Sequence, residues 1–381
     1  MKLVIFGLTL SSSWGNGHAT LWRGLVRALV CGGHDVVFFE RDVPYYAAHR
    51  DLDCIPGAQL VLYGDWRAVN QQARHHVESA DAVIVTSYCE DAVAAGRLSL
   101  EVNRAPLRVF YDLDTPVTLA RLRAGERVPY LPAEGLASFD LVLSYAGGEA
   151  LDTLRQALRA RRVAPLYGHV DPQAHRPTPR RTGPRFDLSY LGTYANDRQP
   201  ALRTFFIDAA RGQPARQFVL GGSGYPRDFP WSANISFVHH VPPARHGEFY
   251  ASSRLTLNVT RADMAASGFC PSGRLFEAAA CGTPLLSDGW RGLDQFFVPG
   301  KEILVVRSTQ DVENALQLSD TELSRIAQAA LERVLAEHTS AHRAAQLEKL
   351  LEQTGRVENA GDWMRPLRAH QTAGVPLAGG S

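Results

Sequence analysis

Short apolar segments alternate with helix-like segments along most of this chain, and the alternation runs twice. Segments that are short and apolar throughout are typical of strands buried on both faces of a parallel sheet. Strands that alternate with helices predict a parallel, doubly wound α/β sheet. In the first half we expect strands at residues 2–8, 34–40, 58–63, 82–86, 107–111 and 139–144.

A proline-rich segment separates the two halves. Residues 163–185 (VAPLYGHVDPQAHRPTPRRTGPR) contain five prolines and several basic residues. This composition continues neither a helix nor a central strand, so it predicts an interdomain linker. After it the alternation resumes, with strands expected at 186–191, 217–220, 235–238, 254–259, 283–287 and 303–306, and helices at 199–210, 244–251, 311–316, 320–338 and 340–352.

The length of 381 residues is too great for one core and suits two domains. We expect an α/β protein with two doubly wound Rossmann-like domains that face each other across a cleft, where the carboxyl ends of the strands bind ligands. The N-terminal domain should span 1–166 and the C-terminal domain 177–338. A helix at 340–353 should pack back on the N-terminal domain, and the Gly- and Pro-containing tail 354–381 should be disordered.

Composition narrows the class of protein. Hydrophobic residues make up 45% of the chain and charged residues 21%, which is typical of soluble globular proteins. The formal net charge of +1 gives no basis for expecting a nucleic-acid partner. No apolar stretch reaches the roughly 18 residues of a membrane-spanning helix. The cysteines lack CxxC or zinc spacing and predict reduced thiols in a cytoplasmic protein; they lie at positions 31, 54, 89, 270 and 281.

Residues 269–288 (FCPSGRLFEAAACGTPLLSD) read as a turn, a buried helix, a glycine stop at Gly282 and a strand. Ser272 is placed to cap the helix start. One carboxylate, Glu277, lies in the apolar run, and Arg274 precedes it by about one turn on the same face. A buried carboxylate needs partners. Either the helix start with Arg274 binds a phosphate while Glu277 accepts ribose hydroxyls, or Arg274 and Glu277 pair to plug an interface.

Two loops of the first half carry polar side chains at the expected cleft. The loop after the first strand, SSSWGNGHATLWRG, lacks the GxGxxG and GxxxxGK[ST] patterns, so it is no dinucleotide or P-loop fingerprint. Its Gly15, Asn16 and Gly17 permit close approach of a ligand, and His18 is either an active-site residue or a structural cap. The later segment YDLDTPVTL places Asp112, Asp114 and Thr115 at a strand end, where Asp114 serves as a base or merely caps a helix.

Three loops of the second half should converge at one end of their sheet. They are GTYANDRQP (192–200), GGSGYP (221–226) and NVTRADMAASGF (258–269). The glycines leave room for a ligand, and an arginine near a helix start is suited to a phosphate. The residues expected to bind there are Gly192, Thr193, Arg198, Gly221, Gly222 and Ser223.

The segment GRLFEAAACGTPLLSD resembles the donor-binding signature of nucleotide-sugar glycosyltransferases with the GT-B fold. Together with SSSWGNGHATLWRGLVRAL, HDVVFFERDVPYY, SYLGTYANDRQ and NVTRADM, it looks like the CgeB-like branch, named after a spore-coat maturation protein. The resemblance covers residues 1–353. It implies a bacterial enzyme that moves a sugar from a nucleoside-diphosphate sugar to an acceptor, and it leaves the sugar, the base and the acceptor open.

The resemblance also implies roles for particular residues. Glu277 would bind the donor ribose, and Arg198 would assist with the pyrophosphate. The backbone amides that would hold the pyrophosphate are those of Ser272, Gly273, Arg274 and Leu275. The segment FVHHVP looks like the one that touches the nucleobase, which makes His240 and Val241 candidates. Many retaining relatives carry a second glutamate where this chain has Phe269, so the stereochemistry of transfer stays open.

The chemistry expected of such an enzyme needs little covalent participation by the protein. Amide and guanidinium groups that point at the leaving diphosphate stabilise the negative charge that develops on it. If the reaction inverts the anomeric centre, a base is required, for which His18 and Asp114 are the candidates. No carboxylate pair is set for a divalent ion, so we expect neither a metal nor another cofactor. The alternatives are a sugar-nucleotide epimerase on the same fold and a non-catalytic nucleotide-binding or scaffold protein.

Overall fold

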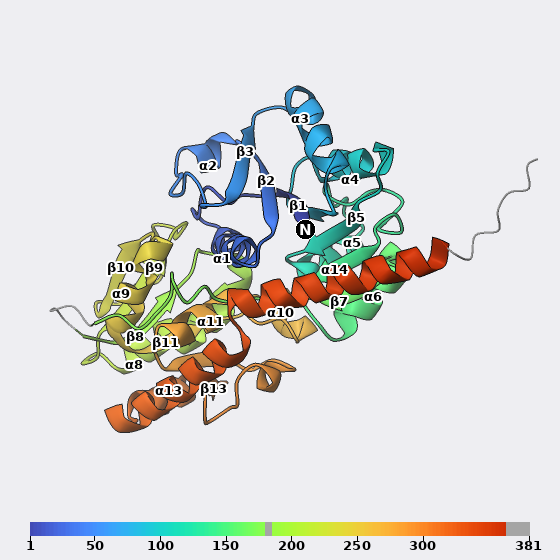
Figure 1. Cartoon of the computed structure of the whole chain (residues 1–381). Helices are drawn as coiled ribbons and strands as arrows, with labels where there is room; N and C mark the ends of the chain where they lie inside the picture. Colours follow the sequence, from blue (N-terminus) through green and yellow to red (C-terminus); the bar gives the residue numbers. More distant parts are fainter. Residues whose placement is uncertain (180–184, 363–381) are drawn as a thin grey trace, which may run out of the picture.

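The structure is a computed structural model that describes residues 1–179 and 185–362, and these form two α/β domains (Figure 1). Every strand pair in the two sheets is parallel, as expected for doubly wound domains. The two sheets are separate and contain seven and six strands. The predicted fold class is therefore confirmed.

The N-terminal sheet has the strand order β3-β2-β1-β4-β5-β6-β7. Its central strands are apolar and buried because helices connect each strand to the next and cover the sheet, whereas the edge strands β3 and β7 are partly exposed. Their bounds are β1 (Lys2–Gly7), β2 (Asp35–Arg41), β3 (Ala58–Tyr63), β4 (Ala82–Thr86), β5 (Leu107–Asp112), β6 (Leu141–Ser144) and β7 (Val163–Pro165). The helices are α1 (Gly17–Cys31), α2 (Pro44–Ala47), α3 (Trp66–Glu78), α4 (Ala92–Glu101), α5 (Thr115–Arg123) and α6 (Glu149–Leu158).

The C-terminal sheet has the order β10-β9-β8-β11-β12-β13. Its strands are β8 (Phe186–Leu191), β9 (Phe218–Gly222), β10 (Ile235–His239), β11 (Ser253–Asn258), β12 (Leu285–Asp288) and β13 (Leu304–Val306). The helices are α7 (Gln199–Leu202), α8 (Asp208–Gly212), α9 (His246–Ala251), α10 (Ala262–Ser267), α11 (Gly273–Ala280), α12 (Thr309–Leu316) and α13 (Asp320–Glu337). A π-helical segment, Arg203–Ile207, joins α7 to α8, so the helix expected at 199–210 is continuous but not regular.

Two expectations about the chain between and after the domains need correction. Residues 163–165 of the expected linker form β7, which pairs with β6 at the sheet edge. A proline is tolerated there because an edge strand has a free side that needs no donor. The last helix, α14 (Ser340–Asp362), extends nine residues beyond 353, so 354–362 are helical rather than disordered. The rest of the expected tail, 363–381, lies outside the described residues.

Helix α14 connects the two domains. It follows α13 of the C-terminal domain and runs back along the N-terminal domain (Figure 1). There it packs against α1 and β5, and Ala344, Leu347 and Leu351 join the core of the N-terminal domain. Among the described residues, we find no helix with both the length and the apolarity that membrane crossing requires.

Candidate active site

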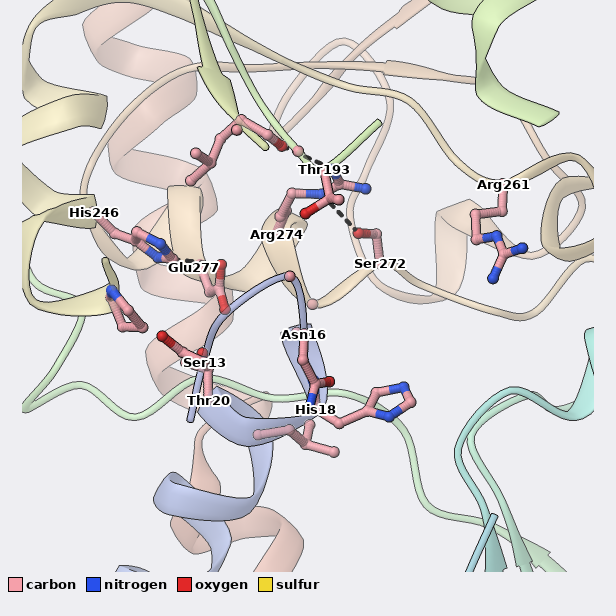
Figure 2. A pocket seen from close by; sticks show the side chains of 18 of the residues that line it. Ser13, Asn16, His18, Thr20, Thr193, His246, Arg261, Ser272, Arg274 and Glu277 are labelled. Carbon is pink, nitrogen blue, oxygen red and sulfur yellow. Dashed lines mark hydrogen bonds and ion pairs between the residues drawn. The ribbon is translucent and has the colours of Figure 1, made fainter. Parts of the chain in front are cut away.

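A cavity of about 280 Å³ lies between the domains, lined by loops from the carboxyl ends of both sheets (Figure 2). The N-terminal domain contributes the loop after β1, the start of α1 and the loop after β5. The C-terminal domain contributes the loops after β8, β9, β10 and β11 and the start of α11. Sixteen of the residues predicted from the sequence line this cavity: Gly15, Asn16, Gly17, His18, Asp114, Gly192, Thr193, Arg198, Gly222, Ser223, His240, Val241, Ser272, Gly273, Arg274 and Glu277.

Two predicted site residues lie elsewhere. The side chain of Leu275 is fully buried in the core, and its amide donates to the carbonyl of Ser272 at 3.0 Å, so it is engaged within the first turn of α11. Gly221 is a buried residue of β9 whose carbonyl accepts from the amide of Gly192 at 2.9 Å. Neither residue lines the cavity, because each belongs to the framework behind it.

Helix α11 begins at the cavity with little local capping. Ser272 occupies the N-cap position, but its side chain makes no capping hydrogen bond. The predicted cap is therefore wrong; the Ser272 hydroxyl instead accepts from Nε of Arg274 at 3.3 Å. Gly282 follows the helix with φ of 70°, a conformation that favours glycine. The first amide groups of α11 thus lack a side-chain acceptor at the wall of the cavity, where an anion can take that place.

Arg274 ties the loops of the C-terminal domain together. Its Nη1 donates to the carbonyl of Leu191 at 2.8 Å and its Nη2 to that of Val259 at 3.4 Å. Its guanidinium also lies over the ring of Tyr190. A Cβ atom at Gly192 would come within 2.4 Å of Nη1, so a larger residue there would displace the guanidinium. Among the described residues Arg274 forms no ion pair with Glu277, so the hypothesis that these two residues plug an interface is wrong.

Arg198 is a buried cation without a carboxylate partner in the described part of the chain. Its Nη2 donates to the carbonyl of Thr193 at 2.8 Å, which orients the guanidinium toward the loop after β8. Its Nε is buried and has no hydrogen-bond partner among the described residues. The neighbouring Asp197 pairs with Arg261 at 3.0 Å instead. A buried charge that lacks a counter-ion is costly, so this wall of the cavity is suited to an anion.

Glu277 points into the cavity from the second turn of α11 (Figure 2). Its side chain is buried, and the one ion-pair contact recorded for it among the described residues is with His246, whose Nδ1 lies 3.7 Å from Oε2. Glu302 shows the usual pattern of a buried structural glutamate, because it pairs with Arg333. Among the described residues, Glu277 has no arginine or lysine partner of this kind. Its carboxylate is therefore available to hydrogen-bond donors that enter the cavity.

His18 and Asp114 meet on the opposite wall, with Nε2 of His18 3.7 Å from Oδ2 of Asp114. The cap of α1 is Asn16, whose side chain accepts from the amide of His18, so the His18 side chain is not the cap. Burial opposes ionisation of Asp114, but the hydrogen bond and charge of His18, helped by the Tyr88 hydroxyl, lower its pKa. Asp114 occupies the N-cap position of α5 without a side-chain capping bond. The pair is thus a carboxylate facing an imidazole across the cavity from α11.

Asp112 and Thr115, which the sequence places beside Asp114, do not reach the cavity. Asp112 is fully buried, and burial raises its pKa to about 6. The Thr115 hydroxyl lies within hydrogen-bond distance of the Ser144 hydroxyl at 2.7 Å. Of the three polar residues at this strand end, only Asp114 lies at the ligand-facing surface.

Sequence reasoning missed several residues of the cavity, among them Tyr145, His169, His246 and Arg261. None belongs to a short motif, and His246 comes from α9, whose sequence HGEFYA carries no ligand signal. Arg261 belongs to the loop NVTRADM, and the signal that could have found it is an arginine close to the end of a strand.

An aromatic contact joins the two domains at His240, one of the residues that line the cavity. Trp14, from the loop after β1, stacks on His49 with ring centroids 3.9 Å apart. Its ring centroid also lies 4.4 Å from that of His240 of the opposite domain.

Phe269 stands where many retaining relatives carry a glutamate. It packs at the domain boundary, since a Cβ atom at Gly148 would come within 2.4 Å of its ring. Phe269 does not line the cavity.

Comparison with known proteins agrees with this arrangement. Residues 198–349 match the sequence profile of a family described as "Glycosyl transferase-like". No curated protein matches the chain in sequence. Among solved structures, sucrose-phosphate synthase from Thermosynechococcus elongatus is similar with a TM-score of 0.67 and 16% identity, covering 94% of this chain and 100% of its own.

Two further structures resemble the chain over nearly its whole length. HepE from Anabaena, in complex with UDP and glucose, has a TM-score of 0.65 and 13% identity, covering 92% of this chain and 99% of its own. An α-glucosyltransferase in complex with UDP and a 13-mer DNA has a TM-score of 0.68 and 13% identity, with coverage of 92% and 99%. The chain therefore has the GT-B fold of these glycosyltransferases, and its residues 198–349 carry a glycosyltransferase-like domain.

Proposed function

We propose that the cavity binds a nucleoside-diphosphate sugar and transfers the sugar to an acceptor hydroxyl. The observation that carries the proposal is Arg198, a buried guanidinium with an unpartnered Nε and no ion pair among the described residues. Arg274 and the start of α11 adjoin the same cavity. A diphosphate placed between them would supply the missing counter-charge.

The same groups would assist the chemistry. When the bond between the sugar and the diphosphate breaks, negative charge grows on the leaving phosphate. Donors that are already aimed at that phosphate stabilise this charge more than they stabilise the intact donor, and such differential binding lowers the barrier. Glu277 is one turn deeper on α11, where its carboxylate can accept hydrogen bonds from the ribose of the same nucleotide.

The opposite wall would hold the acceptor. His18 and Asp114 face α11 across the cavity, which places them on the side from which an acceptor hydroxyl would approach. His18 would take the proton of that hydroxyl, and Asp114, whose pKa is lowered, would stabilise the resulting imidazolium. This assignment predicts inversion at the anomeric carbon.

A binding and turnover experiment tests the proposal. Some of the solved structures that resemble this chain are complexes with UDP or a UDP-sugar, so UDP is the first nucleotide to test, together with the other nucleoside diphosphates. We expect UDP or another diphosphate to raise the melting temperature and to bind in calorimetric titration. Free diphosphate should then be released from the donor only when an acceptor is added. Conversion of the donor to an isomer without an acceptor would instead identify an epimerase.

Transfer should not require a divalent metal. The groups at the proposed diphosphate site are cationic arginines and the neutral N–H donors of a helix start, which together can stabilise the charge that a metal stabilises elsewhere. We expect the transfer rate to be retained in excess EDTA, measured with a donor and acceptor pair found by the screen. Complete loss in EDTA, with recovery on addition of Mg²⁺ or Mn²⁺, would contradict this.

The finer assignments rest on the sequence resemblance. We propose that the chain belongs to the CgeB-like branch and acts in the bacterial cytoplasm without a nucleic-acid partner. The α-glucosyltransferase that resembles it in fold is a complex with DNA, so a DNA oligonucleotide belongs among the acceptors screened.

A further inference from the structure

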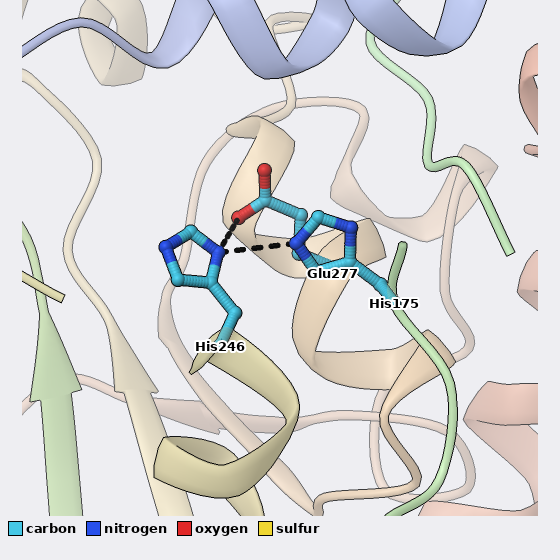
Figure 3. Close-up of side chains that lie close together, drawn as sticks. All are labelled: His175, His246 and Glu277. Atoms are coloured by element: carbon cyan, nitrogen blue, oxygen red, sulfur yellow. Dashed lines mark hydrogen bonds and ion pairs between the residues drawn. The ribbon is translucent and has the colours of Figure 1, made fainter. Parts of the chain in front are cut away.

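Three buried side chains from separate elements converge behind the proposed ribose position. His175 comes from the segment between the domains, His246 from α9 and Glu277 from α11 (Figure 3). Nε2 of His175 lies 3.1 Å from Nδ1 of His246, which lies 3.7 Å from Oε2 of Glu277. One ligand atom of each residue lies within 4.8 Å of the others.

The hydrogen bonds fix which nitrogen of His246 faces this cluster. Nε2 of His246 lies 3.2 Å from the carbonyl oxygen of Val241. A carbonyl oxygen only accepts, so Nε2 carries the ring proton and Nδ1 of the neutral ring presents a lone pair.

The arrangement leaves two electron-pair donors facing each other. The Nδ1 lone pair of His246 and the carboxylate of Glu277 point to the same space, where they repel in the absence of a cation. The only donor that reaches Nδ1 of His246 within the described residues is His175, whose own Nδ1 is buried without a partner.

We propose that His175, His246 and Glu277 form a binding site for a zinc-class divalent ion. The ligands would be Nε2 of His175, Nδ1 of His246 and one carboxylate oxygen of Glu277. Two imidazoles and one carboxylate suit Zn²⁺ and its neighbours better than Mg²⁺, which prefers oxygen ligands. In a tetrahedral zinc site with bonds of about 2.0–2.1 Å, ligand atoms lie roughly 3.3 Å apart. Two of the pairs found here, at 3.1 and 3.7 Å, are close to this separation, and all three ligand atoms lie within 4.8 Å of one another.

The surroundings of the cluster agree with such a site. The bond from Nε2 of His246 to Val241 is the kind of outer contact that orients a metal-ligating histidine. His246 and Glu277 line the cavity, whereas His175 lies behind it. An ion with three protein ligands would therefore keep its fourth position toward the cavity.

The site has a consequence for the donor, and this part rests on the proposed function. An ion that holds the Glu277 carboxylate competes with ribose hydroxyls for the same oxygens. Bound Zn²⁺ should therefore raise the apparent Kd of UDP by a factor of one plus the ratio of free Zn²⁺ to its own Kd, and UDP should weaken Zn²⁺ reciprocally. The site is inhibitory, in accord with transfer that persists in EDTA.

The test uses Co²⁺ as a spectroscopic substitute for Zn²⁺ on the full chain. We expect one Co²⁺ per chain with the strong visible bands of a tetrahedral site, displaced by Zn²⁺. His175→Gln should abolish these bands, whereas His169→Gln, another buried histidine at the cavity, should retain them. Glu277→Gln is the second variant should His175→Gln fail to fold by circular dichroism. Sulfur-to-cobalt charge-transfer bands would instead place the ion on the exposed Cys31 or Cys54 and overturn the assignment.

The His175→Gln variant also separates the two proposals. It retains Glu277, so it should bind UDP normally while losing the inhibition by Zn²⁺; inhibition that persists in it would reflect chelation of Zn²⁺ by UDP and overturn the inhibitory role. If the wild-type chain binds UDP but shows no Co²⁺ bands, only the metal-site proposal is contradicted. If the chain binds Co²⁺ but no nucleoside diphosphate, only the donor-site proposal is contradicted.

Discussion

Replacement of His18 by alanine is expected to lower the rate of sugar transfer by about 10²–10⁴-fold while leaving the affinity for UDP nearly unchanged. The reason is position: His18 lies across the cavity from α11 and beside Asp114, away from the proposed diphosphate groups. Asp114→Asn should lower the rate as well, because the amide no longer stabilises the imidazolium with a negative charge. Initial rates with a saturating donor, together with calorimetric titration of UDP, measure both effects.

The control for His18→Ala is His75→Ala, an exposed histidine on α3 that should leave the rate and the affinity unaltered. The anomeric configuration of the product, read by NMR early in the reaction, provides an independent check, since a base at His18 predicts inversion. A retained configuration, or full activity of His18→Ala, would remove His18 from the role of base.

The fold could be predicted from the sequence because its signal is local and repeated. A parallel strand buried on both faces must be apolar over its whole length, so each of the expected strands appears in the sheets near its expected position. The ends of elements depend on tertiary contacts. The sequence around Pro165 predicts a linker because prolines are rare in central strands. The pairing of β7 with β6 places Pro165 at a sheet edge, where a proline is tolerated, and this pairing is not visible in the sequence.

Sequence reasoning located residues that line the cavity where glycine-rich loops follow strands, and it missed residues whose contacts are distant in sequence. Arg274 and Glu277 are three residues apart, which made an ion pair between them a reasonable hypothesis. The structure shows that Arg274 instead contacts carbonyls of Leu191 and Val259. His175 and His246 are separated by 71 positions, so no spacing rule could bring them to Glu277. Long-range packing determines these contacts.

Replacement of Glu277 by glutamine is expected to weaken UDP binding by roughly ten- to a hundredfold. A neutral amide of nearly the same shape loses the equivalent of one charge-assisted hydrogen bond to ribose, which is worth about 1.5–3 kcal/mol. The fold should be retained, because among the described residues Glu277 has no arginine or lysine partner whose charge would be left unpaired. Calorimetric titration with UDP and a melting curve measure the two quantities on the same preparation.

Glu302→Gln is the matched control for this change. Glu302 is equally buried but lies outside the cavity, where it accepts from Arg333 and from the amide of Val298. Loss of its charge leaves the Arg333 guanidinium without its partner, so we expect a lower melting temperature with unchanged UDP affinity. Glu277→Gln should give the opposite pattern. If Glu277→Gln lowers the melting temperature and leaves UDP affinity intact, Glu277 is a structural residue and the ribose must be bound by other groups of the cavity.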